Sequence, residues 1–221
     1  MADHLEDDEQ VEALKRWWDE NGRSTVVAVV LAVAGTLGWQ QYQGYTADQA
    51  AMAADAWQTI QLKLDSEVEA DQAEAEQLAE ALKSAHGGTA YARFAAMRLA
   101  AIAVKNGDLD AAEAQLRWAL TKEGSTSELG QLLQLRLARV LAASGDEAAA
   151  LAILEAGSNA YSAAYAIARG DIHLASGRQQ SALDAYREAR AAMLALGNPP
   201  GILDTKITSL ESRLASAENA S

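Results

Sequence analysis

The sequence has no cysteine, two prolines and one phenylalanine among its 221 residues. The absence of cysteine excludes disulfides, thiolate zinc sites, iron–sulfur clusters and a cysteine nucleophile. The three histidines show none of the short spacings of helical zinc motifs, and the acidic stretch over residues 65–80 lacks the glycine turn of a calcium loop. We therefore expect no metal site.

Recognisable catalytic motifs are also missing. We find no phosphate-binding loop, nucleophile elbow or dinucleotide fingerprint, and no plausible pair of catalytic carboxylates. We therefore expect no catalytic residues, no cofactor and no enzymatic activity. Acidic residues outnumber basic ones by 31 to 18, which gives a net charge of -13. Because phosphate backbones are bound by basic surfaces, we expect no nucleic-acid partner.

The chain contains one long uncharged run. Residues 24–43 carry no charge, and the next charged residue is Asp48. At about 1.5 Å of rise per residue, a helix of this length crosses a hydrocarbon core of about 30 Å. Trp17 and Trp18 precede the run and Trp39 lies near its end, as in the aromatic belts of membrane interfaces. The run predicts a transmembrane helix in a lipid bilayer over residues 24–43.

Two other interpretations of this run remain open. The first is the core helix of a soluble domain, although such a helix is usually bounded by caps and turns. The second is a cleaved signal peptide, because residues 32–34 (Ala-Val-Ala) resemble a cleavage site. A long acidic segment precedes the run, however, and the apolar stretch continues past that site to Trp39.

The basic residues near the run predict its direction. Lys15, Arg16 and Arg23 lie on the N-terminal side, whereas the next basic residue after the run is Lys63. By the positive-inside rule, residues 1–23 are cytoplasmic and the larger C-terminal part lies on the periplasmic side of a bacterial inner membrane.

The N-terminal tail has an apolar face of its own. Val11, Leu14, Trp17 and Trp18 share one side of a helix that we expect to end at Asn21-Gly22. Such a short amphipathic helix either lies on the inner leaflet or docks on another membrane protein.

Glycine turns recur in the second half of the chain. Gly107, Gly145 and Gly177 lie 38 and 32 residues apart, near the roughly 34-residue period of tetratricopeptide repeats. A glycine ends a helix through the left-handed conformation, and a polar residue can cap the next helix, as we expect for Thr89 after a glycine pair. These turns predict three helical hairpins.

Placing each glycine at a turn assigns the positions where paired helices touch. Small residues allow the helices to approach, and a larger one fills the gap between repeats. The small residues are Ala100, Ala138 and Gly170 in the first helices and Ala112, Ala150 and Ala182 in the second, with Leu116, Leu154 and Tyr186 as the large ones. Arg169 departs from the pattern, because a leucine is expected there.

Further helices flank the repeats. Residues 46–65 and 68–85 predict two helices before them, and residues 202–218 predict an amphipathic helix after the break at residues 198–201. A last helix of this kind covers the apolar end of a repeat array. We therefore predict an all-α chain with a single N-terminal transmembrane helix, a tetratricopeptide-like α-solenoid over residues 46–221 and a C-terminal capping helix.

These elements resemble the YfgM family, the ancillary subunits of the bacterial SecYEG translocon. The resemblance rests on residues 8–22 (DEQVEALKRWWDENG), Gly38-Trp39, residues 135–140 (LRLARV), residues 169–171 and 176–177, and Lys206-Ile207. It implies an inner-membrane protein with a periplasmic repeat domain. It also implies three kinds of partner: the SecYEG translocon, a membrane-anchored periplasmic isomerase-like chaperone, and exported client proteins that are passed on to periplasmic chaperones.

A candidate protein-binding groove follows from the repeat register. The first helices of such repeats line a groove, which here would include Phe94, Met97, Val104, Leu132, Leu135, Arg139, Ile167 and Leu174. This face is apolar, which is typical of a partner site unless neighbouring helices cover it. The alternative function is an envelope scaffold that organises cell-wall or division machinery through the same repeats.

Overall fold

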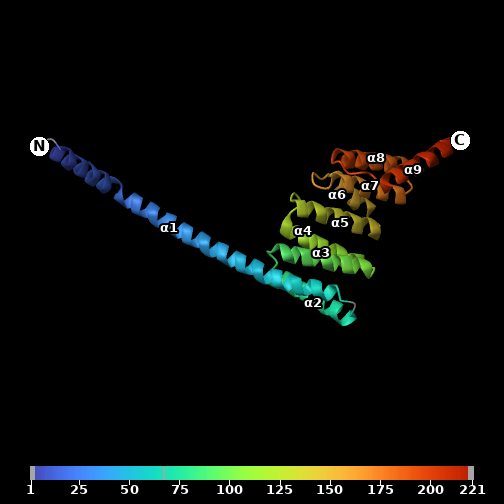
Figure 1. The fold of residues 1–221 in the computed structure, drawn as a ribbon, viewed down its shortest axis with the longest axis horizontal. Coiled ribbons are helices and arrows are strands. Elements are labelled where there is room, and N and C mark those ends of the chain that lie inside the picture. Colours follow the sequence, from blue (N-terminus) through green and yellow to red (C-terminus); the bar gives the residue numbers. More distant parts are fainter. Residues whose placement is uncertain (1–2, 67, 219–221) are drawn as a thin grey trace. The chain divides into compact units, whose positions relative to one another are not determined.

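The computed structural model describes residues 3–66 and 68–218, and within these ranges it contains helices and no strand (Figure 1). The described helices are α1 (Asp3–Leu64), α2 (Glu69–Ala85), α3 (Ala90–Lys105), α4 (Leu109–Glu123), α5 (Glu128–Ser144), α6 (Glu147–Glu155), α7 (Ser162–Ala175), α8 (Gln179–Ala195) and α9 (Ile202–Glu218). The all-α prediction is confirmed. The chain divides within α1 into an N-terminal unit, residues 1–52, and a repeat unit, residues 53–221.

The helix α1 runs without a break through Asn21 and Gly22. The prediction that this dipeptide ends a separate tail helix is therefore wrong, as is the prediction that a new helix begins at residue 46. A single glycine costs a helix only about 1 kcal/mol, which is less than the hydrogen bonds of the long helical segments on either side contribute. The Asn21 carbonyl also accepts hydrogen bonds from the hydroxyls of Ser24 and Thr25, at 2.7 and 2.9 Å.

The uncharged run lies in the N-terminal unit, and its large side chains are exposed, including Leu31, Leu37 and Trp39. By length and composition α1 could cross a membrane, and only 6% of its apolar window is buried. A core helix of a soluble domain would be mostly buried, so this exposure argues against that interpretation.

The repeat unit is built from helical hairpins that follow one another in chain order from α3 to α8 (Figure 1). Gly107, Gly145 and Gly177 lie in the turns within these hairpins, with φ of 79°, 94° and 75°. Only glycine adopts this left-handed region without strain, so the predicted role of the three glycines is confirmed.

Side-chain caps begin several of these helices. Thr89 Oγ1 accepts the Ala92 N–H at 3.3 Å, as predicted. Asp108 and Asp146 cap α4 and α6 in the same way, whereas Arg178 at the start of α8 makes no side-chain cap. The third hairpin therefore lacks the side-chain N-cap that begins the second helix of the first two hairpins.

The predicted contact positions all lie in the interior. Small residues occupy the close approaches and large ones fill the space between hairpins, as the repeat register requires. All nine are buried: Ala100, Ala138, Gly170, Ala112, Ala150, Ala182, Leu116, Leu154 and Tyr186.

Apolar packing also joins the flanking helices to the array. Ala53 and Ile60 of α1 share one buried cluster with α2 and α3. At the other end, Leu203, Ile207 and Leu210 of α9 pack on α7 and α8. The prediction of a C-terminal helix that covers the last hairpin is confirmed.

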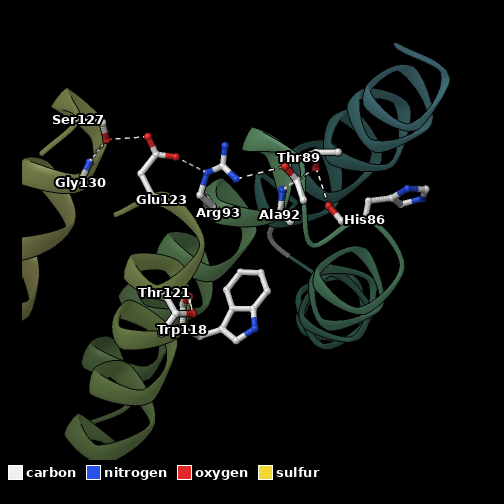
Figure 2. A network of polar contacts seen from close by, with 10 residues as sticks. His86, Thr89, Ala92, Arg93, Trp118, Thr121, Glu123, Ser127 and Gly130 are labelled. Atoms are coloured by element: carbon white, nitrogen blue, oxygen red, sulfur yellow. Dashed lines mark hydrogen bonds and ion pairs between the residues drawn. The ribbon is translucent and has the colours of Figure 1, made fainter. Parts of the chain in front are cut away.

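A polar network connects α3 to the α4–α5 connection (Figure 2). Arg93 Nε lies 2.6 Å from a Glu123 carboxylate oxygen, and both side chains are largely buried. The Nε–H is not aimed at that oxygen, so the contact is an ion pair without an aligned hydrogen bond. Glu123 accepts from the Ser127 hydroxyl at 2.6 Å, and Ser127 in turn caps α5 through the Gly130 N–H. One carboxylate thus links two repeats.

Candidate protein-binding groove

A depression of about 270 Å³ opens between α3, α4 and α5. Its walls are almost entirely apolar, apart from two arginines. The lining residues are Met97, Ala100, Ala101, Val104, Leu109, Leu116, Arg136, Arg139, Val140 and Ala143.

A second depression, of about 410 Å³, lies beside the first. It is lined by Trp57, Gln61, Asp65, Phe94, Met97, Arg98, Ala101 and Arg136. Because Met97, Ala101 and Arg136 border both depressions, the two form one continuous surface, which we call the groove. Its lining residues recur three or four positions apart on α1, α3 and α5, so each helix contributes a single face.

Aromatic side chains form one end of the groove. The Trp57 and Phe94 rings lie 6.2 Å apart between centroids, and Tyr91 meets Phe94 edge-on at 6.1 Å. Aromatic pairs at such separations stabilise the contact between elements. They join the end of α1 to α3, so α1 forms a fixed wall of the groove.

Four of the eight predicted groove residues line this surface. Met97 and Val104 contribute apolar floor, Arg139 contributes charge, and Phe94 belongs to the aromatic end. Met97 is only 8% exposed, whereas Val104 is 45% exposed. A partner would therefore touch Val104 directly and Met97 only at its edge.

The other four predicted residues lie elsewhere in the repeat unit. Leu135 is buried in the largest core cluster, and Leu132 is partly buried against the same cluster. Ile167 and Leu174 are partly buried against the cluster that joins α7, α8 and α9. The structure thus brings together the predicted residues of α3 with Arg139, and it separates them from those of α7.

Unpaired arginines gather at the groove; elsewhere in the described part of the repeat unit, Arg213 on α9 is the one arginine without a carboxylate partner. Arg98, Arg136 and Arg139 are exposed, and none forms an ion pair or hydrogen bond with another described residue. Six other arginines in this unit pair with carboxylates: Arg93, Arg117, Arg169, Arg178, Arg187 and Arg190. Partial burial lowers the pKa of Arg136, and repulsion from Arg139 lowers it further.

Sequence reasoning missed several residues of the groove. Arg136 lies four residues after Leu132 and three before Arg139, so the helical stripe that suggested both could have included it. No such signal marks Trp57 and Gln61, because the sequence predicts that their segment, residues 46–65, precedes the repeats. Only the packing of α1 against α3 brings them to this surface.

The acidic stretch before α3 is held by local partners. Lys63 pairs with Glu74 at 2.7 Å and with Asp71 at 3.5 Å. The hydrogen bond from Ser66 lowers the pKa of Asp71, and the charge of Lys63 adds to this effect. Among the described residues, no group of histidine, aspartate and glutamate could hold a metal ion; the side chains of Glu67 and Glu69 in this stretch lie outside them.

Comparison with known proteins gives matches along nearly the whole chain. A family model described as a tetratricopeptide repeat-like domain matches residues 15–212. A Haemophilus influenzae protein named ancillary SecYEG translocon subunit is 34% identical over 86% of this chain and 91% of its own length. Proteins of the same name from Escherichia coli and Neisseria gonorrhoeae are 31% and 29% identical, over 84% and 96% of this chain and 88% and 100% of their own lengths.

No solved structure matches the chain. The assignment rests on the sequence relatives together with the helical hairpins and glycine turns described above, which agree with the matched repeat model. The chain belongs to the family of ancillary SecYEG translocon subunits, and it carries a tetratricopeptide repeat-like domain.

Proposed function

We propose that this protein is a non-enzymatic, membrane-anchored interaction protein that associates with the SecYEG translocon in the bacterial inner membrane. The observation that carries the proposal is the match of nearly the entire chain to relatives named for that translocon. The exposed, uncharged run in α1 fits a protein of the inner membrane.

In this proposal residues 24–43 cross the membrane, residues 1–23 are cytoplasmic and residues 46–221 form a periplasmic domain. The positions of Lys15 and Arg16 before the run support this direction. The chain has no cysteine, so single cysteines can report on it directly. With a membrane-impermeant maleimide on spheroplasts, we expect the Ser125→Cys chain to be labelled at once and the Asp19→Cys chain only after permeabilisation. The reverse pattern would overturn the direction.

The repeat domain would receive exported proteins near the translocon and help to pass them to periplasmic chaperones, including a membrane-anchored isomerase-like one. Tethering supports this role, because an anchored domain is present at a high effective concentration beside the channel and weak contacts then suffice. The groove offers the surface, with apolar floor and fixed walls.

Site-specific photocrosslinking in living cells tests the proposal. A photoreactive residue at Leu37 would probe the exposed apolar run, one at Val104 would probe the groove, and one at Arg213 on α9 would serve as the matched control. We expect adducts with translocon subunits from Leu37 and with exported chains or chaperones from Val104. The absence of translocon adducts from every position would refute the association. Adducts with cell-wall or division proteins would instead favour the envelope scaffold.

A further inference from the structure

The charge of the groove opposes the charge of the chain. The protein has a net charge of -13, yet the groove contains three guanidinium groups and a single carboxylate, that of Asp65 at its α1 end. Asp65 forms no ion pair with another described residue. Positive charge is therefore concentrated on one apolar surface of an acidic protein.

Two of the three arginines are also arranged at an energetic disadvantage. Arg136 and Arg139 lie three residues apart on α5, so their like charges repel across one helical turn. Arg136 is in addition partly shielded from water. A carboxylate supplied by a ligand would remove the repulsion and replace the lost hydration with a charge-assisted hydrogen bond.

We propose that the groove selects segments of partner proteins that are both apolar and acidic. An aliphatic or aromatic side chain of the segment enters the depression beside Met97 and Val104, and carboxylates on the same segment pair with Arg98, Arg136 and Arg139. This inference rests on the proposed role of the groove as a protein-binding surface, and it adds the chemistry of the partner.

Other classes of ligand fit the groove less well. Nucleic acid would be repelled by the net charge of -13, and three arginines are too few to offset that repulsion. A basic segment would be attracted by the chain as a whole but would meet uncompensated guanidinium groups in the groove. A simple anion would use the arginines but would leave the apolar floor unused.

Peptide binding to the full chain in nanodiscs of neutral lipid separates these cases. The first probe is a fluorescent amphipathic peptide with leucine at helical spacing and glutamate beside each leucine. The second probe replaces every glutamate with lysine, and the third replaces every leucine with serine. We expect the acidic apolar peptide to bind at least about tenfold more tightly than either of the others, with an affinity that falls as salt is added.

Variants connect that selectivity to the groove. The R136Q/R139Q chain should lose about tenfold or more in affinity for the acidic apolar peptide, and the R136K/R139K chain should retain most of it. The matched control is R213Q, which removes an exposed arginine on α9 and should change nothing. Because Arg136 and Arg139 are exposed and their charges repel, circular dichroism should remain that of the wild type and the melting temperature should not fall.

Three outcomes would overturn the proposal. The lysine peptide could bind as tightly as the acidic one, which would show that the net charge dominates. The serine peptide could bind equally well, which would reduce the groove to an anion site. The R136Q/R139Q chain could bind as well as R213Q, which would place the site elsewhere.

The same variants distinguish this inference from the association with the translocon. If wild type shows no translocon adducts but binds the acidic apolar peptide through Arg136 and Arg139, the proposed function fails and the inference stands. If translocon adducts form and the peptides show no selectivity, the inference fails alone.

Discussion

Replacing Gly170 with alanine tests the packing at the centre of the last hairpin. An added Cβ would overlap the ring of Tyr186, lying 2.5 Å from Cδ1 and closer still to Cε1. The ring cannot move away easily, because it is fully buried, its hydroxyl donates to Asp171 at 2.6 Å, and the Lys206 ammonium lies 5.0 Å above it. Overpacking of this kind costs up to about 3 kcal/mol, and the better helix propensity of alanine returns about 1 kcal/mol.

We therefore expect the G170A chain to be about 2 kcal/mol less stable, which for a domain of this size lowers the melting temperature by roughly 4–8 °C. Thermal unfolding in detergent, followed by far-ultraviolet circular dichroism, measures this shift, and hydrogen exchange should show the loss in α8 and α9. The matched control is Gly44→Ala, because no atom lies within 4 Å of its added Cβ. A G170A chain that melts at or above the wild-type temperature would refute the packing argument.

The first two hairpins suggest how to rescue that variant. In each of them an alanine at the small position accompanies a leucine sixteen residues later: Ala100 with Leu116, and Ala138 with Leu154. The third hairpin combines Gly170 with Tyr186 at the same spacing. The double variant G170A/Y186L therefore restores the combination used by its neighbours, and its destabilisation should fall short of the sum of the single effects by about 1 kcal/mol or more. Additive single effects would show that the two positions do not share space.

Three further perturbations follow from the described contacts. Gly130→Ala would push a Cβ into the carbonyl oxygen of Gly124, where the backbone has little room to move. We therefore expect the free energy of unfolding in urea to fall by about 2–3 kcal/mol. A urea midpoint equal to that of the wild type would show that the connection between α4 and α5 adapts. Glu123→Gln should lower the free energy of unfolding by about 1–3 kcal/mol in the same assay, because it leaves the largely buried Arg93 without its counter-charge. Adding Arg93→Met to this variant removes the unpaired charge and should recover part of the loss. Burial and the hydrogen bond to Asp171 raise the pKa of Tyr186 above its ordinary value near 10. The unfolded chain therefore releases that proton at lower pH than the folded chain, and the free energy of unfolding should decline above about pH 10. Y186F should weaken this decline, and an unchanged slope of stability against pH in that variant would contradict the argument.

The features that sequence predicted well are those set by local chemistry. Gly107 and Gly145 have positive φ because a helical hairpin of this kind needs a left-handed residue, and that need is visible in the residue type alone. Thr89 caps α3 for an equally local reason. The capping helix α9 could be predicted because apolar side chains at helical spacing follow a break with two prolines.

The features that sequence missed depend on competition between distant or weak effects. Asn21-Gly22 carries a local stop signal, yet α1 continues, because one glycine is a small penalty in a helix of 62 residues. Leu135 and Leu132 share an apolar helix with Arg139, and which of them faces the core is decided by the neighbouring helices α4 and α6 and not by the pattern on α5.

The groove combines both kinds of information. Its apolar floor could be predicted because Met97 and Val104 recur at helical spacing on α3, but its charge could not, since a single arginine in a sequence does not reveal whether a carboxylate will lie beside it. In this protein most arginines of the repeat unit find such a partner, and the three beside the groove do not. An acidic chain with 31 carboxylates could have paired them. Their unpaired state is therefore a property of the three-dimensional arrangement. It leaves the repulsion between Arg136 and Arg139 uncompensated, and an acidic, apolar partner segment would remove that repulsion.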